Sequence, residues 1–84
     1  MTNKEKGIRI QDALRETNHL LEKANKNYSD SIKYLIMEIE DNKELGNTKQ
    51  ANFLAVGHAN KDKARVKELQ DHKKMLESMY SSLN

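Results

Sequence analysis

The sequence predicts an all-α fold, an antiparallel hairpin of two long helices, and three observations support this prediction. Proline, which loops and sheet turns normally use, is absent from all 84 residues. Apolar residues recur at steps of three and four on both sides of the middle of the chain, as they do on one face of a helix. Between these stretches, the turn at residues 45–48 supplies a helix stop at Gly46 and a helix start at Asn47 or Thr48. A connection this short turns the chain back on itself.

The first helix is expected over about residues 8–44. Its apolar stripe consists of Ile10, Leu14, Thr17, Leu21, Ala24, Tyr28, Ile32, Leu35 and Ile39. Residues 1–7 are polar, and we expect them to form a frayed N-terminal tail. Thr2 and Glu5 have the spacing of a capping box, but Gly7 would cost about 1 kcal/mol inside the first turns of a helix.

One segment of the first helix leaves an alternative open. Residues 25–31 are poor helix formers apart from Lys26, and Ser29 or Asp30 could cap a new helix. A break near residues 27–30 would produce a three-helix bundle. We favour one continuous helix, because the apolar stripe crosses this segment without losing its phase.

The second helix is expected over about residues 49–82. Leu69, Leu76 and Leu83 share one heptad position, and this repeat favours gentle supercoiling against the first helix, as in a coiled coil. The whole chain, residues 1–84, is therefore predicted to form a single hairpin domain.

Folding the two helices together predicts a polar layer. With the turn near residues 46–47, facing residues have numbers that sum to about 93, as antiparallel pairing requires. This register places Asp62 beside Ser31 and within reach of Tyr28. A carboxylate on an apolar stripe needs a polar partner, so we expect Tyr28, Ser31 and Asp62 to hold the helices in register.

A lone hairpin leaves apolar residues in water, and these predict an assembly. The half of the chain near the turn carries apolar residues off the main stripe. They are Tyr34, Ile36, Met37, Leu45, Phe53 and Val56. A helix that is apolar nearly all round is normally buried. We therefore expect this surface to form a homodimer, a four-helix bundle, with docking on another protein as the alternative.

The composition argues against several kinds of chemistry. Zero cysteines exclude thiolate metal sites and disulfides, and no apolar run has the length of a membrane span, so the expected location is the cytoplasm. His58 and Asp62 stand four residues apart, as do Glu68 and His72, but a metal site needs further ligands. No glycine-rich loop or nucleophile–base pair is present. We expect no catalytic residues, no metal and no cofactor.

The expected function is therefore that of a small non-enzymatic regulator, inhibitor or adaptor that works by protein–protein contact, and its partner is not identified by the sequence. The Lys-, Asn-, Ile- and Glu-rich composition is typical of bacterial or phage proteins from AT-rich genomes. The first alternative is a nucleic-acid-binding accessory protein, which would bind phosphates through the basic stretch 61–74. Its basic residues are Lys61, Lys63, Arg65, Lys67, Lys73 and Lys74.

A second alternative comes from a resemblance. In its length, its two long helices and its short turn, the chain resembles the small secreted hairpins of the WXG100 family. The turn reads Glu44-Leu45-Gly46 where that family has Trp-x-Gly, and the last residues, from Tyr80 to Asn84, approximate its Tyr-x-x-x-Asp/Glu export signal. The resemblance implies a secreted hairpin protein.

Overall fold

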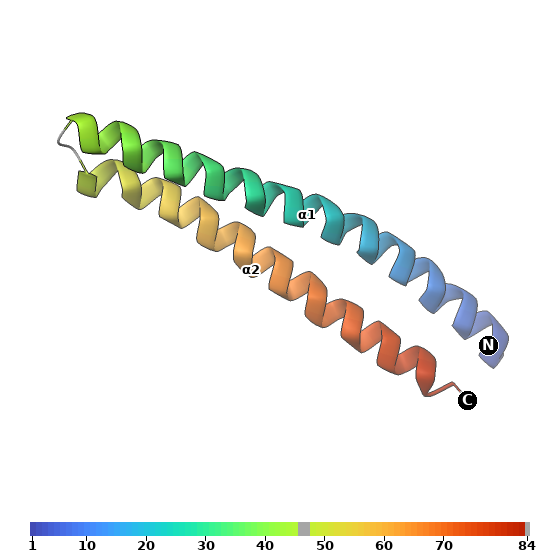
Figure 1. Ribbon diagram of the computed structural model, residues 1–84. Helices are drawn as coiled ribbons and strands as arrows, with labels where there is room; N and C mark the ends of the chain where they lie inside the picture. The colour runs from blue at the N-terminus through green and yellow to red at the C-terminus, as the bar shows by residue number, and fades with distance from the viewer. Residues whose placement is uncertain (46–47, 84) are drawn as a thin grey trace.

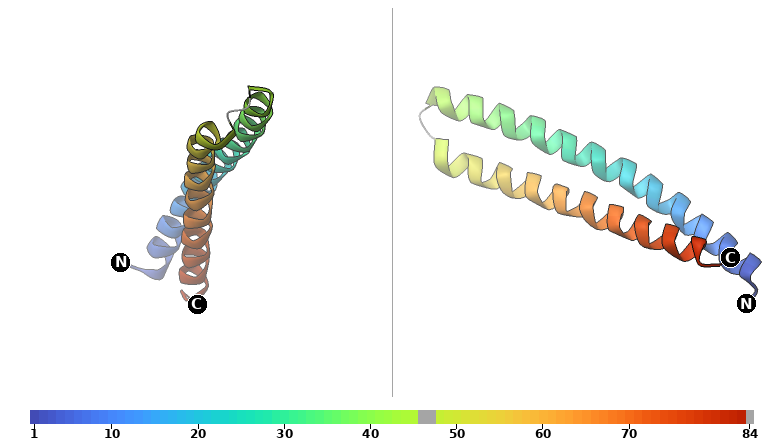
Figure 2. Two further views of the ribbon diagram at one scale, coloured as in Figure 1. Left: turned by 90° about the vertical axis from the view of Figure 1, so that its left-hand side faces the viewer. Right: turned by 60° about the horizontal axis from the view of Figure 1, so that its bottom comes forward.

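The chain folds into two long helices that lie side by side and run in opposite directions (Figure 1). The computed structural model describes the backbone of residues 1–45 and 48–83 and the side chains of residues 1–41 and 55–83. Helix α1 spans Asn3–Leu45 and helix α2 spans Thr48–Ser81. The two helices wind gently around each other, and both termini lie at the same end of the rod (Figure 2). The predicted all-α helical hairpin is confirmed.

Helix α1 is continuous, so the three-helix alternative with a break near residues 27–30 is wrong. Contacts with α2 stabilise the helical conformation of this segment, although its residues are poor helix formers. Tyr28 packs against the buried cluster of Ala24, Val66 and Leu69, while the Ser31 hydroxyl donates a hydrogen bond to the Asp62 carboxylate. Tertiary packing therefore outweighs the weak local propensity, as it often does in helices.

Helix α1 begins at Asn3, within the tail predicted at residues 1–7 and five residues before the predicted start near residue 8. The Thr2 hydroxyl accepts a hydrogen bond from the backbone N–H of Glu5 at 3.2 Å, as an N-cap residue does. Gly7 is buried against the rings and methyl groups of Tyr80 and Leu83, 3.6 and 3.7 Å from where a Cβ would lie. This close approach offsets the poor helix propensity of glycine and lengthens the hairpin at its open end.

The core of the hairpin is a narrow line of side chains between the two helices. Its buried apolar members are Ile10, Ala24, Ala55, Ala59, Val66, Leu69 and Leu76. Thr17 is also buried, and its hydroxyl donates a hydrogen bond to the carbonyl of Ala13 at 2.7 Å, so no polar atom of this side chain is left unpaired. Ala24 lies level with Leu69, as the predicted register requires. Small residues facing large ones let the helices approach closely.

Near the turn, the line of contact differs from the predicted apolar stripe. It follows Ser31, Leu35 and Glu38, which are half-buried, whereas Ile39 is exposed. Supercoiled helices keep a strict seven-residue repeat in contact, and Ser31 and Glu38 continue the repeat of Thr17 and Ala24. An apolar stripe with the 3.6-residue period of a straight helix drifts away from that line. The drift turns Ile39 toward the side of the hairpin.

Gly57 provides a test of how far the helices depend on packing. It lies in the interior of α2, is exposed, and has no neighbour within 4 Å of the place where a Cβ would be. Gly57→Ala is therefore expected to stabilise the protein by about 0.5–1 kcal/mol, because alanine loses less backbone entropy in a helix. Chemical denaturation followed by circular dichroism measures the change. A loss of stability would show that this side of α2 is packed against another chain.

Candidate functional site

The exposed apolar side chains of the hairpin are its main candidate for function. They are Met1, Ile8, Leu20, Tyr34, Ile36, Met37, Ile39, Val56, Met75, Met79 and Tyr80. Each step along a helix turns a side chain by about 100°. Because Leu35 lies on the line of contact, Tyr34 and Ile36 point to opposite sides of the hairpin. The exposed residues therefore divide between two sides.

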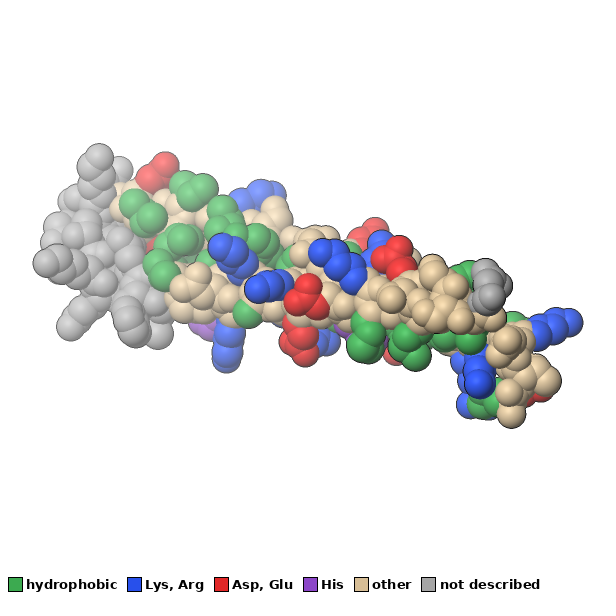
Figure 3. Space-filling view, turned by 90° about the horizontal axis from the view of Figure 1, so that it is seen from below, with side chains coloured by type: hydrophobic (Ala, Val, Ile, Leu, Met, Phe, Trp, Pro, Cys, Tyr) green, Lys and Arg blue, Asp and Glu red, His purple; other side chains and the backbone are tan. Residues whose placement is uncertain are grey.

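We name the two sides by their members. The isoleucine side holds Ile32, Ile36, Ile39 and Val56 close to the turn, and Ile8 and Tyr80 beside Gln11 near the free ends. The groove side holds Leu20, Tyr34, Met37, Met75 and Met79, which extend from the turn toward the free ends. Figure 3 shows two groups of hydrophobic side chains, one beside the grey residues and one nearer the free ends on the opposite edge.

This division corrects the single interface predicted from the sequence. Ile36 and Val56 lie on the isoleucine side, whereas Tyr34 and Met37 lie on the groove side, so these four residues do not form one surface. The side chains of Leu45 and Phe53 lie outside the described residues.

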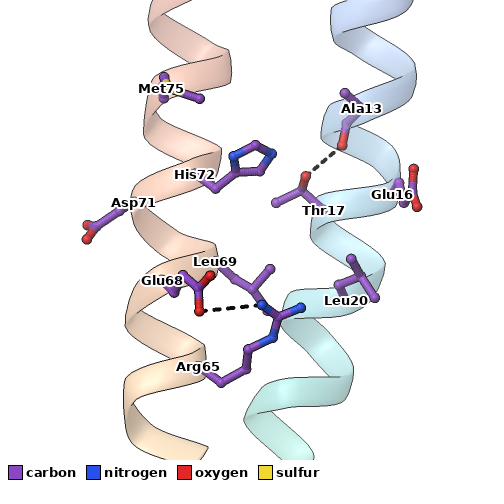
Figure 4. Close-up of a pocket in the computed structure, with 10 residues that line it drawn as sticks. All are labelled: Ala13, Glu16, Thr17, Leu20, Arg65, Glu68, Leu69, Asp71, His72 and Met75. Carbon is purple, nitrogen blue, oxygen red and sulfur yellow. Dashed lines mark hydrogen bonds and ion pairs between the residues drawn. The ribbon is translucent and has the colours of Figure 1, made fainter.

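The groove side is hollowed. A groove of about 600 Å³ runs between the helices, and Figure 4 shows the side chains around it. Its lining residues are Ala13, Glu16, Thr17, Leu20, Arg65, Glu68, Leu69, Asp71, His72 and Met75. Leu20 is 37 % exposed and Met75 51 %. A second hollow of about 410 Å³, lined by Ile10 and Met79 among others, continues toward the free ends.

The charges around the groove are paired only within one helix. Arg65 forms an ion pair with Glu68 of its own helix at 3.5 Å, and a second ion pair, Arg15 with Asp12 at 3.7 Å on α1, lies outside the groove lining. Glu16 lies at the outer edge of the groove, on α1 (Figure 4). Across the part of the chain that the structure describes, no ion pair joins the two helices. The Arg65–Glu68 pair is exposed to solvent, with 53 % and 71 % of the two side chains accessible, so another molecule can reach its charges.

The predicted polar layer is present in part. Ser31 and Asp62 are half-buried and hydrogen-bonded to each other, which confirms that pair. Tyr28 instead packs against the apolar cluster of Ala24, Val66 and Leu69.

The predicted basic patch is not one surface. Successive residues of α2 are rotated by about 100° around the helix axis. This rotation places Lys63, Lys67 and Lys74 toward the isoleucine side, and Lys61 and Arg65 toward the groove side. Lys73 is half-buried on the line of contact. Only three of these six cations share a face, which is a small electrostatic footprint for binding a nucleic acid backbone.

The described residues contain no group of three or more His, Asp and Glu side chains able to hold a metal ion. Asp62, half of the His58–Asp62 pair, is engaged with Ser31. Among the described residues, neither helix combines the length and hydrophobicity needed to cross a bilayer. Comparison with models of known protein families, with curated proteins and with solved structures finds no match.

The sequence interpretation missed Leu20, Met75 and Met79 as a connected surface. The signal was present, because Met75 and Met79 are four residues apart and lie off the predicted stripe of the second helix. Joining them to Leu20 on the other helix required the register of the two helices.

Tyr34 on the groove side offers a test by pH. Its hydroxyl donates a hydrogen bond to the Glu38 carboxylate, and this bond and the negative charge of Glu38 raise the pKa of Tyr34 above 10.0. Glu38→Gln removes the charge that opposes ionisation, so the pKa of Tyr34 is expected to fall toward its ordinary value. NMR titration of ring-labelled tyrosine follows Tyr34 separately. Glu40→Gln is the matched control, and an equal fall in that variant would contradict a local contact.

Proposed function

We propose that this chain is a non-enzymatic protein that works by protein–protein contact, as a regulator, inhibitor or adaptor, and that its first partner is a second copy of itself. One observation carries the proposal, the amount of surface that a single hairpin leaves in water. The hairpin measures 63 × 15 × 14 Å and has a radius of gyration of 18.9 Å. A compact chain of this length would have a radius of gyration of about 12 Å.

The excess surface is large enough for a stable interface. The hairpin exposes 6822 Å², whereas a compact monomer of its mass would expose about 5,100 Å². The difference of roughly 1,700 Å² is about twice the ~800 Å² that each partner contributes to a standard interface. Pairing two hairpins into a four-helix bundle would bring the exposed area into the normal range.

The exposed side chains supply a driving force for this pairing. Met75 is 51 % exposed and Met79, four residues farther along α2, is 48 % exposed. Fully burying a large apolar side chain is worth roughly 1.5–3 kcal/mol, so a half-exposed one has roughly half of this still to gain. Several such residues together can outweigh the entropy that two chains lose on association. We infer a cytoplasmic location because a chain without cysteine is suited to a reducing compartment.

Sedimentation velocity from low to high micromolar concentration tests the proposal. The expected result is a mass of two chains, with a melting temperature that rises with protein concentration, because dimer stability follows mass action. A protein that stays monomeric at high micromolar concentration would refute the homodimer. The apolar sides would then belong to contacts with a different protein.

A further inference from the structure

We infer that the second copy packs along the groove side, with turn beside turn, so that α1 of each copy lies against α2 of the other. This inference rests on the proposed self-association and adds the face and the direction of the contact. The isoleucine side of each copy remains on the outside of the resulting four-helix bundle.

Two groups of exposed apolar residues lie on the groove side, one toward each end of the rod. Tyr34 and Met37 lie near the turn, and Leu20, Met75 and Met79 lie nearer the free ends, with charged and polar residues between the two groups. The isoleucine side also has two apolar groups, with Ile36, Ile39 and Val56 near the turn and Ile8 and Tyr80 beside Gln11 near the free ends. Between these groups its exposed residues are polar, namely Asn18, Glu22, Asn25, Lys67, Gln70, Lys74 and Glu77. Both sides therefore offer apolar contact near each end of a second rod, and the charges between the two groups decide which side it meets.

The register of α1 and α2 within one chain also indicates which residues of two copies would face each other. Ser31 lies level with Asp62 and Ala24 with Leu69. When two copies lie turn beside turn, α1 of one copy faces α2 of the other at these same levels. The exposed Leu20 then faces the region of His72 and Met75 of the second copy. All neighbouring helices in this arrangement are antiparallel, as in up-down four-helix bundles.

The charges on the outer edge of the groove side fit the same arrangement. At matching levels, Lys23 of one copy faces Glu68 of the second, and Asp30 faces Lys61. Lys23, Asp30 and Lys61 take part in no ion pair within the described part of one chain, and Glu68 pairs only with Arg65 of its own helix. Two pairs of opposite charge, each repeated by the two-fold symmetry, would line the edges of the interface.

The reverse direction, with the turn of one copy beside the free ends of the other, has the opposite electrostatics. In that arrangement α1 of one copy faces α1 of the other, and the two-fold axis passes near Lys23, in the middle of the helix. At full overlap Lys23 faces its own copy, and Glu16 faces Asp30. Like charges placed opposite each other disfavour a complex, so the charge pattern selects the parallel placement of the two hairpins.

A charge-exchange experiment tests both the face and the direction. The chain with Lys23→Glu carries acidic residues at positions 23 and 68, and the chain with Glu68→Lys carries basic residues at the same two positions. Each chain alone would place like charges together, whereas a mixed dimer restores both pairs of opposite charge. Mixing the two chains is expected to favour the mixed dimer over either homodimer by about tenfold or more, measured by native mass spectrometry of tagged chains. A statistical mixture of dimers would overturn the inference.

The matched control uses the opposite side of the hairpin. Glu22→Lys and Lys67→Glu make the same charge changes at exposed positions toward the isoleucine side. These two chains are expected to form homodimers and mixed dimers in statistical proportion. A strong preference for the mixed dimer in this control pair, and not in the first, would place the interface on the isoleucine side.

Apolar substitutions distinguish this inference from the proposed function. Leu20→Asp with Met75→Asp is expected to convert the dimer to a helical monomer, whereas Ile36→Asp with Val56→Asp is expected to leave a dimer. All four positions are exposed in one hairpin, so circular dichroism should report an intact fold in both variants. A wild type that is monomeric refutes self-association and this inference together. A dimeric wild type that dissociates only with the Ile36 and Val56 changes keeps the proposed function and refutes the groove side.

Discussion

Leu69→Ala is expected to lower the free energy of unfolding by about 2–4 kcal/mol, the range for truncating a buried leucine. Leu69 is 5 % exposed and packs in one cluster with Ala24 and Val66, against which Leu21 and Tyr28 also lie. The buried neighbours are too small to fill the space that the leucine leaves. Because a small domain has only about 5–15 kcal/mol in total, this change removes a large share of the stability.

Urea denaturation followed by circular dichroism measures this loss as a lower midpoint at an unchanged slope. Ile8→Ala is the matched control, because it also truncates an aliphatic side chain in a helix but at a position that is half exposed. We expect its effect to stay below about 1 kcal/mol. Equal losses in the two variants would contradict the placement of Leu69 in the core.

Ser31→Ala is expected to cost about 1–3 kcal/mol, the cost of leaving a half-buried polar group without its partner. The Ser31 hydroxyl is the hydrogen-bond donor that the Asp62 carboxylate uses across the two helices. Asp62→Leu is expected to affect stability differently, because it removes the charge, whereas Ser31→Ala leaves the charged carboxylate without its hydrogen-bond donor. Its stability should stay the same or rise, since apolar replacements of buried polar groups often stabilise.

The polar pair is expected to determine register more than stability. Spin labels at Leu14 and Tyr80, one on each helix, should give a narrow distance distribution in the wild type and a broader one in Asp62→Leu. The double variant Ser31→Ala with Asp62→Leu should be more stable than Ser31→Ala alone, which completes a thermodynamic cycle. A loss of several kcal/mol in Asp62→Leu with an unchanged distance distribution would contradict this role for the pair.

Much of the fold could be predicted from the sequence, because it follows from local rules. The absence of proline and the three–four spacing of apolar residues indicate two helices. The short connection around Gly46 requires them to lie antiparallel, and this in turn sets the register that places Asp62 beside Ser31. The hydrogen bond between these two residues confirms the predicted level. Periodicity and turn length thus determine the elements, their direction and which levels face each other.

Contacts between the helices decided the rest. Gly7 belongs to α1 because Tyr80 and Leu83, more than seventy residues away in the sequence, pack against it. Ile39 belongs to the predicted stripe, yet it is exposed, because the supercoiled pair keeps the seven-residue line of Ser31 and Glu38 in contact. The predicted single interface divides into two sides because Tyr34 and Ile36 flank Leu35 on the line of contact, and each helical step turns a side chain by about 100°. An apolar pattern along one helix shows that a face needs burial, but only the helix packed against it decides which flank stays exposed.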